Sequence, residues 1–130
     1  MHLIICVDDR NGLSFCGRRL SRDRLLIEHI LKLSAGQRIW VHPYSLPLFP
    51  ADTVTAHEAF LNQAQAGEYC FAEISQLPET AESVILYRWN RAYPATETLP
   101  QNFLSSMRLV HTEEFSGSSH EKITMEKYIP

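Results

Sequence analysis

Cysteine is scarce in this sequence, and its three cysteines lie far apart, at Cys6, Cys16 and Cys70. An odd, scattered set is unlike the paired framework of a disulfide-stapled secreted domain. No CxxC pair occurs, so a zinc site built from thiolate pairs is excluded. The pattern favours reduced thiols and predicts a cytoplasmic protein.

Long apolar runs are missing as well. No run of about 18 apolar residues occurs, so the sequence predicts no membrane-spanning helix. The N-terminus lacks the basic segment of a signal peptide and reaches Asp8 and Asp9 after only a few apolar residues. We therefore interpret residues 3–7 as a buried strand rather than as a targeting signal.

Several common catalytic and binding motifs are absent. Neither GxGxxG nor GxxxxGK[ST] occurs, which excludes the usual glycine-rich phosphate loops. The histidines show no HxH or HExxH spacing, so a zinc hydrolase is not indicated and no metal ligand is predicted. The GxSxG nucleophile elbow is missing too.

The composition is that of an ordinary globular domain. The chain has 130 residues, of which 45% are hydrophobic and 21% charged, so we expect a single domain over residues 1–130. The net charge is −3, but the charges are segregated, because seven of the 12 Lys and Arg residues precede residue 39. A basic start can attract anions. The overall balance argues against a nucleic-acid-binding domain, which is usually strongly basic.

Residues 21–36 form the clearest predicted helix. Ser21 can cap its start, and Gly36 can close its end in the left-handed conformation. A period of about 100° per residue places one apolar stripe on this helix. The stripe consists of Leu26, Ile27, Ile30, Leu31 and Leu33. The opposite face carries Arg24, Glu28 and Lys32 at i,i+4 spacing.

The other segments alternate between strands and a helix. Further strands are predicted over residues 38–42, 53–56, 68–74, 83–89, 103–115 and 122–129. A short helix is predicted over residues 57–67, and loops over 43–52, over 90–100 and in the charged stretch between 6 and 24. This order predicts an α/β fold, namely a three-layer sandwich with a mixed sheet and antiparallel C-terminal strands.

Asp23 is the most informative single residue. On the helical wheel it falls in the middle of the apolar stripe, in line with Ile27 and Ile30. One interpretation is an acid favoured by the helix N-terminus, where it would contribute about 0.3–1 kcal/mol. The other is a half-buried carboxylate with a raised pKa, of the kind that acts as an acid, a base or a ligand anchor.

The same stretch is rich in arginine, with Arg10, Arg18, Arg19, Arg22 and Arg24. In one interpretation these side chains form weak surface pairs with neighbouring acids. In the other, they form an anion site beside the helix N-terminus. For the second interpretation the predicted anion-binding residues are Arg18, Arg19 and Arg22.

Two more segments carry candidate site residues. His120 lies in the polar, glycine-containing stretch 115–123 and could serve as an acid or base near neutral pH. Ligand-binding groups collect at strand ends in open α/β sheets, and the end of a buried strand here carries Arg88, Trp89, Asn90, Arg91 and Tyr93. An exposed histidine and an ordinary polar strand end are the structural alternatives.

The order of elements resembles that of dihydrofolate reductase in a shortened form. Residues 3–31 resemble that family's first strand, mobile loop and first long helix. Leu20 and Asp23 stand like the leucine and the acidic residue of its L-P-x-[DE] motif, which implies that Asp23 is the carboxylate that anchors the pterin. The segments that resemble its later elements are 38–49, 68–74, 84–100, 107–115 and 123–129.

The sequence also departs from this family at defined positions. Ser21 takes the place of the proline in the motif, and residues 42–44 replace the basic turn that holds the phosphate of the nicotinamide cofactor. Ala72 and Glu73 replace the glycine pair that lets the pyrophosphate approach the backbone. We therefore predict no cofactor and no nicotinamide-dependent reductase activity.

The chain is also similar to a group of small bacterial proteins that are sometimes labelled ribonuclease Z, which implies a bacterial source. The HxHxDH metal motif of ribonuclease Z is absent here. A zinc-dependent nuclease is therefore not predicted.

Our main hypothesis is a domain that binds a small anionic, nucleotide-like ligand, with Asp23 anchoring a polar ring or amine and Trp89 stacking on it. One alternative is an enzyme that uses Asp23 and His120 as acid and base, such as a divergent reductase or a metal-independent hydrolase. Another is a protein-interaction module in which the basic start and the acidic middle are complementary surfaces, including between copies in a homo-oligomer.

Overall fold

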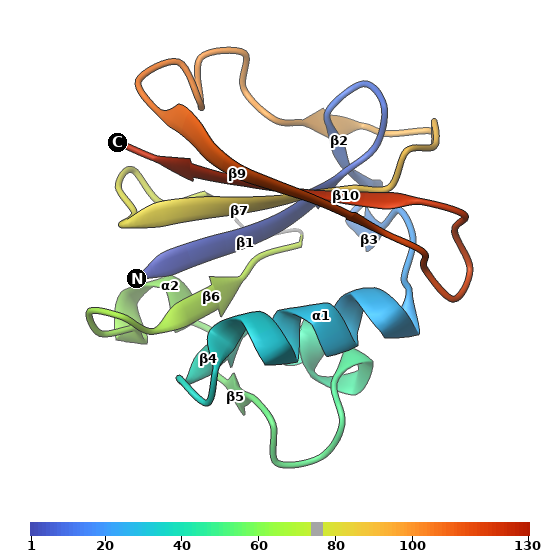
Figure 1. Ribbon diagram of the computed structural model, residues 1–130. Coiled ribbons are helices and arrows are strands. Elements are labelled where there is room, and N and C mark those ends of the chain that lie inside the picture. The colour runs from blue at the N-terminus through green and yellow to red at the C-terminus, as the bar shows by residue number, and fades with distance from the viewer. Residues whose placement is uncertain (74–76) are drawn as a thin grey trace.

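A seven-stranded mixed sheet forms the centre of the molecule (Figure 1). The computed structural model describes residues 1–73 and 77–130. The sheet has the order β5-β4-β6-β1-β7-β10-β9. Its strands are β1 (His2–Val7), β4 (Ile39–Val41), β5 (Thr55–Ala56), β6 (Tyr69–Phe71), β7 (Ser83–Arg88), β9 (Arg108–Phe115) and β10 (Ile123–Ile129). The helices are α1 (Arg24–Ser34), α2 (Phe60–Gln63) and the 3-10 helix η1 (Pro43–Leu48).

One strand of the sheet, β10, runs opposite to its neighbours. The five strands from β5 to β7 are parallel, whereas β10 runs antiparallel to both β7 and β9. In the central pair, Val7 of β1 is in register with Arg88 of β7, and the N–H of Trp89 donates to the carbonyl of Val7. The residues that follow β1 and β7 are therefore neighbours, which is where the candidate site begins.

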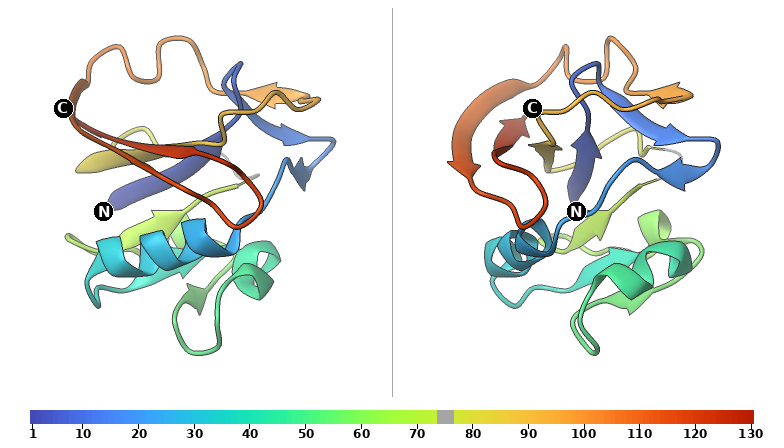
Figure 2. Two further views of the ribbon diagram at one scale, coloured as in Figure 1. Left: turned by 45° about the vertical axis from the view of Figure 1, so that its right-hand side comes forward. Right: turned by 90° about the vertical axis from the view of Figure 1, so that its right-hand side faces the viewer.

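Side-chain alternation along β1 separates two cores. Ile4 packs on one face with Ile30 of α1, while Leu3 packs on the other with Phe60 of α2. Figure 2 shows α1 and the region of β2 (Gly12–Phe15) on opposite sides of the central strands. The predicted three-layer α/β sandwich with antiparallel C-terminal strands is confirmed.

Helix α1 is confirmed, but its start differs from the prediction. The N-cap is Asp23 rather than Ser21, because the Asp23 carboxylate accepts hydrogen bonds from the N–H groups of Leu25 and Leu26. At the other end Gly36 has a φ of 84° and follows Ala35, which is also left-handed. The predicted closure at Gly36 is therefore correct.

The charged stretch between residues 6 and 24 is not the plain loop that we predicted. It contains β2 and β3 (Arg18–Arg19), which form a small sheet with β8 (Glu97–Thr98) from the second predicted loop. Cys16 and Gly17 connect β2 to β3, and both have positive φ angles, as in the primed turns of two-residue hairpins. Cysteine is not a usual residue of such turns, so the sequence did not indicate the hairpin.

Other boundaries also shift. The second helix is limited to Phe60–Gln63 instead of 57–67, because Ala64 is already extended. The segment 43–52 begins with η1, in which a proline stands at the helix start, where the missing N–H has no cost. Strand β9 begins only at Arg108 rather than at 103. The last residue of the strand predicted over 68–74 lies outside the described residues.

Two predictions about the whole chain can be compared with the structure. Within residues 1–73 and 77–130, no helix has the length and apolar character needed to cross a membrane. Cys6, Cys16 and Cys70 are all free thiols, as their spacing predicted. The cytoplasmic location stays a prediction.

The packing of α1 leads to a stability prediction. Ile30 is fully buried against the sheet, so Ile30→Ala is expected to lower the free energy of unfolding by about 2–5 kcal/mol. Lys32 lies on the exposed face of the same helix, and Lys32→Ala should change it by less than about 0.5 kcal/mol. Urea denaturation of both variants is the measurement. Equal losses would mean that α1 does not pack as described.

Candidate functional site

The centre of the site is a buried pair formed by Asp23 and His120. The Nδ1 atom of His120 lies 2.9 Å from Oδ2 of Asp23. Asp23 is 3% exposed and His120 is 5% exposed, although they are far apart in the sequence. The carboxylate stands at the start of α1, and the imidazole stands in the loop between β9 and β10. The pair therefore ties the first helix to the C-terminal hairpin.

Both oxygens of Asp23 are occupied by internal donors. Oδ1 accepts from the N–H groups of Leu25 and Leu26 at 2.9 and 3.2 Å and from the N–H of Ser118 at 2.9 Å. Oδ2 accepts from the N–H of Ser119 at 2.9 Å and from His120. A carboxylate has about four acceptor positions, so little capacity is left for a ligand.

These donors control the charge of Asp23. Burial raises the pKa of its carboxyl, but the backbone N–H groups of Ser118 and Ser119 and the imidazole of His120 lower it by more. The net result is a pKa well below the usual range of an aspartate. Asp23 is thus ionised at neutral pH, opposite to the raised pKa that one interpretation of the sequence favoured.

The other side of His120 contacts two hydroxyl groups. Its Nε2 lies 3.0 Å from Oγ of Ser21 and 3.0 Å from the hydroxyl of Tyr93. The Tyr93 hydroxyl donates to Ser21 Oγ at 3.2 Å. The indole of Trp89 stacks on the imidazole, with 4.6 Å between ring centroids and 26° between planes. His120 is therefore held by contacts on both ring nitrogens and on its face.

A second buried carboxylate positions Tyr93. Asp8 is 1% exposed and directly follows β1. Its oxygens accept from the N–H groups of Arg10 and Gly12 at 2.9 and 2.6 Å, and from the N–H of Tyr93 at 2.9 Å. Asp8 thereby fixes the turn before β2 and the backbone that carries the Tyr93 ring.

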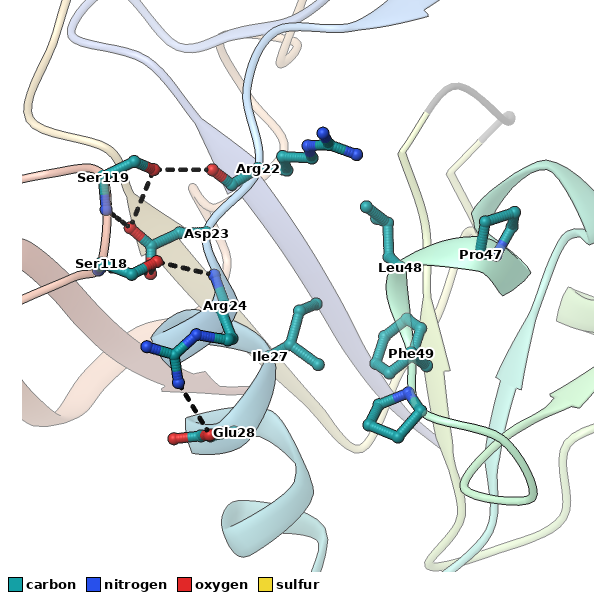
Figure 3. A pocket seen from close by; sticks show the side chains of 11 residues that line it. Arg22, Asp23, Arg24, Ile27, Glu28, Pro47, Leu48, Phe49, Ser118 and Ser119 are labelled. Carbon is teal, nitrogen blue, oxygen red and sulfur yellow. Dashed lines mark hydrogen bonds and ion pairs between the residues drawn. The ribbon is translucent and has the colours of Figure 1, made fainter.

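A cavity of about 580 Å³ opens beside this cluster, between α1, η1 and the β9–β10 loop (Figure 3). Its apolar wall consists of Ile27, Pro47, Leu48, Phe49 and Pro50. Its polar side consists of Arg22, Asp23, Arg24, Glu28, Ser118 and Ser119. The size is within the range typical of small-molecule sites.

The arginines of the basic stretch have different surroundings. Arg22 lines the cavity, and its guanidinium makes no hydrogen bond or ion pair with the part of the chain that the structure describes. Arg24 also lines the cavity, and pairs with Glu28 at 3.3 Å on the surface. Arg18 is exposed on β3 and does not line this cavity. Arg22 and Arg24 are therefore the arginines that the fold brings to the cavity.

Arg19 points elsewhere. Its guanidinium forms a two-point contact with the carboxylate of Glu73 at 2.9 and 3.1 Å. It also lies over the ring of Tyr44, 4.4 Å from the centroid. Glu73 additionally accepts from the hydroxyl of Ser45 at 2.7 Å. Arg19 thus links β3 to η1 and to the end of β6.

The side chains at the end of β7 and just after it point in two directions. Trp89 joins the cluster by stacking on His120. Arg88 instead pairs with Glu126 of β10 at 2.9 Å, and the side-chain N–H₂ of Asn90 donates to Thr124 at 2.9 Å. Neither Arg88 nor Asn90 lines the 580 Å³ cavity. Strand alternation explains this separation, because Arg88 and Trp89 point to opposite faces.

The contacts of Ser21 and Tyr93 with His120 are not predicted by the sequence. Ser21 is predicted as a helix cap and stands at the proline position of the motif, and Tyr93 is one of the strand-end candidates. Their position depends on Asp8 and on the hairpin connection between residues 115 and 123, neither of which has a local sequence signal. No group of three or more metal-ligating side chains is found within residues 1–73 and 77–130.

The role of Asp23 in the fold can be measured. Asp23→Asn should lower the free energy of unfolding at neutral pH by about 2–3 kcal/mol, because hydrogen bonds to a charged acceptor are lost. The folded pKa is depressed, so this stabilisation is complete above the unfolded pKa of about 4 and is lost as the pH falls further. The difference between parent and variant should therefore shrink below about pH 4.

Chemical denaturation from pH 7 to pH 2 is the measurement, with Asp52→Asn as the control for an exposed aspartate. A variant as stable as the parent at pH 7 would show that the donors around Asp23 do not hold its charge.

Comparisons with known proteins agree with the architecture. No family model matches the sequence, and no curated protein sequence matches it. Among solved structures, the chain is similar to a dihydrofolate reductase from Enterococcus faecalis complexed with NADP(H) and RAB-propyl. The TM-score is 0.60 at 10% identity, over 98% of this chain and 94% of that chain. At this identity the likeness concerns the fold alone, and the chain has a dihydrofolate reductase-like fold.

Proposed function

We propose that the 580 Å³ cavity binds a small anionic ligand with an apolar or aromatic body, such as a nucleotide. The observation that carries this proposal is the Arg22 guanidinium, which has no partner among residues 1–73 and 77–130, at a cavity with one polar and one apolar side. Figure 3 shows Arg22 extending on the side of the cavity toward Leu48. A ligand can therefore contact the charge and the apolar wall together.

Arginine side chains, rather than the helix N-terminus, provide the positive charge. The first N–H groups of α1 are already bound, because Asp23 accepts from two of them and the hydroxyl of Ser118 accepts from that of Arg24. Arg24 can turn to a ligand at little cost, since its pair with Glu28 is exposed and such pairs contribute at most about 1 kcal/mol. A bidentate contact from Arg22 to a phosphate or carboxylate would be the main polar interaction.

The apolar wall accounts for the body of the ligand. Ile27 of α1 lies on one side of the cavity, and Leu48 of η1 and the following Phe49 lie on the other (Figure 3). Burial of an aromatic ring between such side chains removes apolar area from water, at roughly 25 cal/mol per Å². The combination favours an amphipathic anion over inorganic phosphate alone.

The proposal does not include a nicotinamide cofactor. The similar dihydrofolate reductase is complexed with NADP(H). In this chain Ala72 is buried, and Glu73 places a carboxylate where the resemblance expects a glycine pair. A pyrophosphate there would meet a β-carbon and a negative charge that is already engaged with Arg19. These contacts support a binding site that differs from that of a reductase.

Adenosine monophosphate is a suitable first probe, with adenosine as its neutral counterpart. The nucleotide should raise the melting temperature, because a ligand that binds only the folded state stabilises it by RT ln(1 + [L]/Kd). Adenosine should raise it less, and added salt should reduce the effect of the nucleotide. Arg22→Ala should weaken nucleotide binding about ten-fold or more, which corresponds to about 1.4 kcal/mol.

Arg18→Ala is the matched control, because Arg18 is a nearby exposed arginine outside the cavity. It should bind the nucleotide as the parent does. If Arg22→Ala and Arg18→Ala both respond like the parent, the anion does not bind in this cavity.

The absence of reductase-type cofactor binding is tested separately. Titration of the reduced cofactor NADPH, followed by fluorescence or calorimetry, should show no binding with a Kd near or below about 1 μM, which is about −8 kcal/mol. Tight, saturable binding would contradict the steric and electrostatic argument from Ala72 and Glu73.

A further inference from the structure

Three side chains of the cluster are arranged as a proton relay that anion binding does not require. Asp23 Oδ2 lies 2.9 Å from His120 Nδ1, and His120 Nε2 lies 3.0 Å from Ser21 Oγ. We propose that Ser21 is the nucleophile of an esterase-type hydrolase and that His120 is its general base. In this assignment Asp23 is a positioning residue, and the substrate is a carboxylic ester with an apolar body.

The hydrogen-bond partners of the imidazole select one tautomer of its neutral form. The oxygens of Asp23 accept from several backbone N–H groups, so this carboxylate is an acceptor toward His120 as well. In the neutral form Nδ1 therefore carries the proton, and Nε2 is an acceptor that faces the Ser21 hydroxyl. This is the tautomer that a serine nucleophile requires.

Two neighbouring groups favour Ser21 over other nucleophiles. The hydroxyls of Tyr93 and Ser21 both lie 3.0 Å from Nε2 of His120, and when Tyr93 donates to Ser21 Oγ the Ser21 proton is the one directed at His120. Cys6 lines the same small cavities as Ser21, but burial raises the pKa of its thiol well above the usual range. The thiol thus stays protonated, and no base is in contact with it among the hydrogen bonds of the described residues.

The position of Ser21 connects the relay to the ligand cavity. Ser21 is half-buried and lines a small inner cavity of about 10 Å³, which is enough for one water molecule. Arg22, Asp23, Ile27 and Leu48 line both this cavity and the one of about 580 Å³. Ser21 does not line the large cavity itself, so the proposal requires that an ester whose apolar body occupies that cavity widens the small one when its carbonyl reaches Ser21.

The reaction that this geometry supports has two steps. Ser21 Oγ attacks the ester carbonyl carbon and gives its proton to His120 Nε2; the C–O bond of the ester then breaks, and the alcohol leaves with that proton. Water next attacks the acyl group on Ser21 and gives a proton to His120, which returns it to Ser21 as the carboxylic acid is released. The guanidinium of Arg22, which lines both cavities, is the donor that we assign to the oxyanion.

Reaction with phenylmethylsulfonyl fluoride tests the nucleophile without any anion, so it is independent of the proposed ligand. Intact mass spectrometry should show one phenylmethylsulfonyl group per parent chain that withstands dithiothreitol, which removes such groups from thiols. Ser21→Ala should acquire none. His120→Gln should be labelled about a hundred-fold more slowly, because general base catalysis typically contributes a factor of about 100 to 10,000.

Ser105→Ala is the matched control, because Ser105 is an exposed serine outside the site, and it should be labelled like the parent. Thermal unfolding verifies that each variant is folded, and Ser21→Ala decides the question alone if His120→Gln does not fold. The proposal is overturned if the folded parent is not labelled, or if Ser21→Ala is labelled at the same rate.

Discussion

The buried charge of Asp23 is the interaction on which the site depends. A carboxylate that is removed from water must be satisfied by donors, or the fold loses several kcal/mol. Here the donors come from the first turn of α1 and from the loop after β9, so one side chain joins two distant segments. Gly117 makes this approach possible, because a β-carbon at this position would contact both Oδ2 of Asp23 and Cδ1 of Ile123.

The same principle operates on the other side of the cluster. Asp8 is buried at the end of β1 and holds the turn before β2 together with the backbone of Tyr93. Two internal carboxylates thus fix the two groups that contact His120 from opposite directions, Tyr93 and the start of α1. The positioning groups are internal and saturated, whereas the guanidinium of Arg22 remains at the cavity surface. The residues that hold the cluster in place are therefore different from the arginine that we propose as the ligand contact.

The sequence predicts those parts of the fold that have a local signal. The apolar stripe of residues 21–36 and the run at 3–7 indicate α1 and β1, and the order of elements indicates the three-layer sandwich. Burial of Asp23 also follows from its place on the stripe. The partners of Asp23 do not, because the loop of residues 116–120 has no periodicity and is brought to the helix by the pairing of β10 with β7 and β9. For the same reason the contacts of Ser21 and Tyr93 with His120 could not be identified from the sequence, and the hairpin at Cys16–Gly17 lacks the usual Asn-Gly or Asp-Gly signal.

A shared fold can therefore place different chemistry at the same strand ends. The resemblance to dihydrofolate reductase implies a carboxylate at position 23 that contacts the ligand. It also implies a glycine pair at positions 72–73 that leaves the backbone open to a pyrophosphate. In this chain the oxygens of Asp23 are filled by internal donors, and Glu73 is engaged by Arg19 and Ser45. The groups that remain available are the Arg22 guanidinium and the hydroxyls around Nε2 of His120. These groups suit recognition of an anion and proton transfer to or from a hydroxyl, and neither function requires the contacts that Ala72 and Glu73 obstruct.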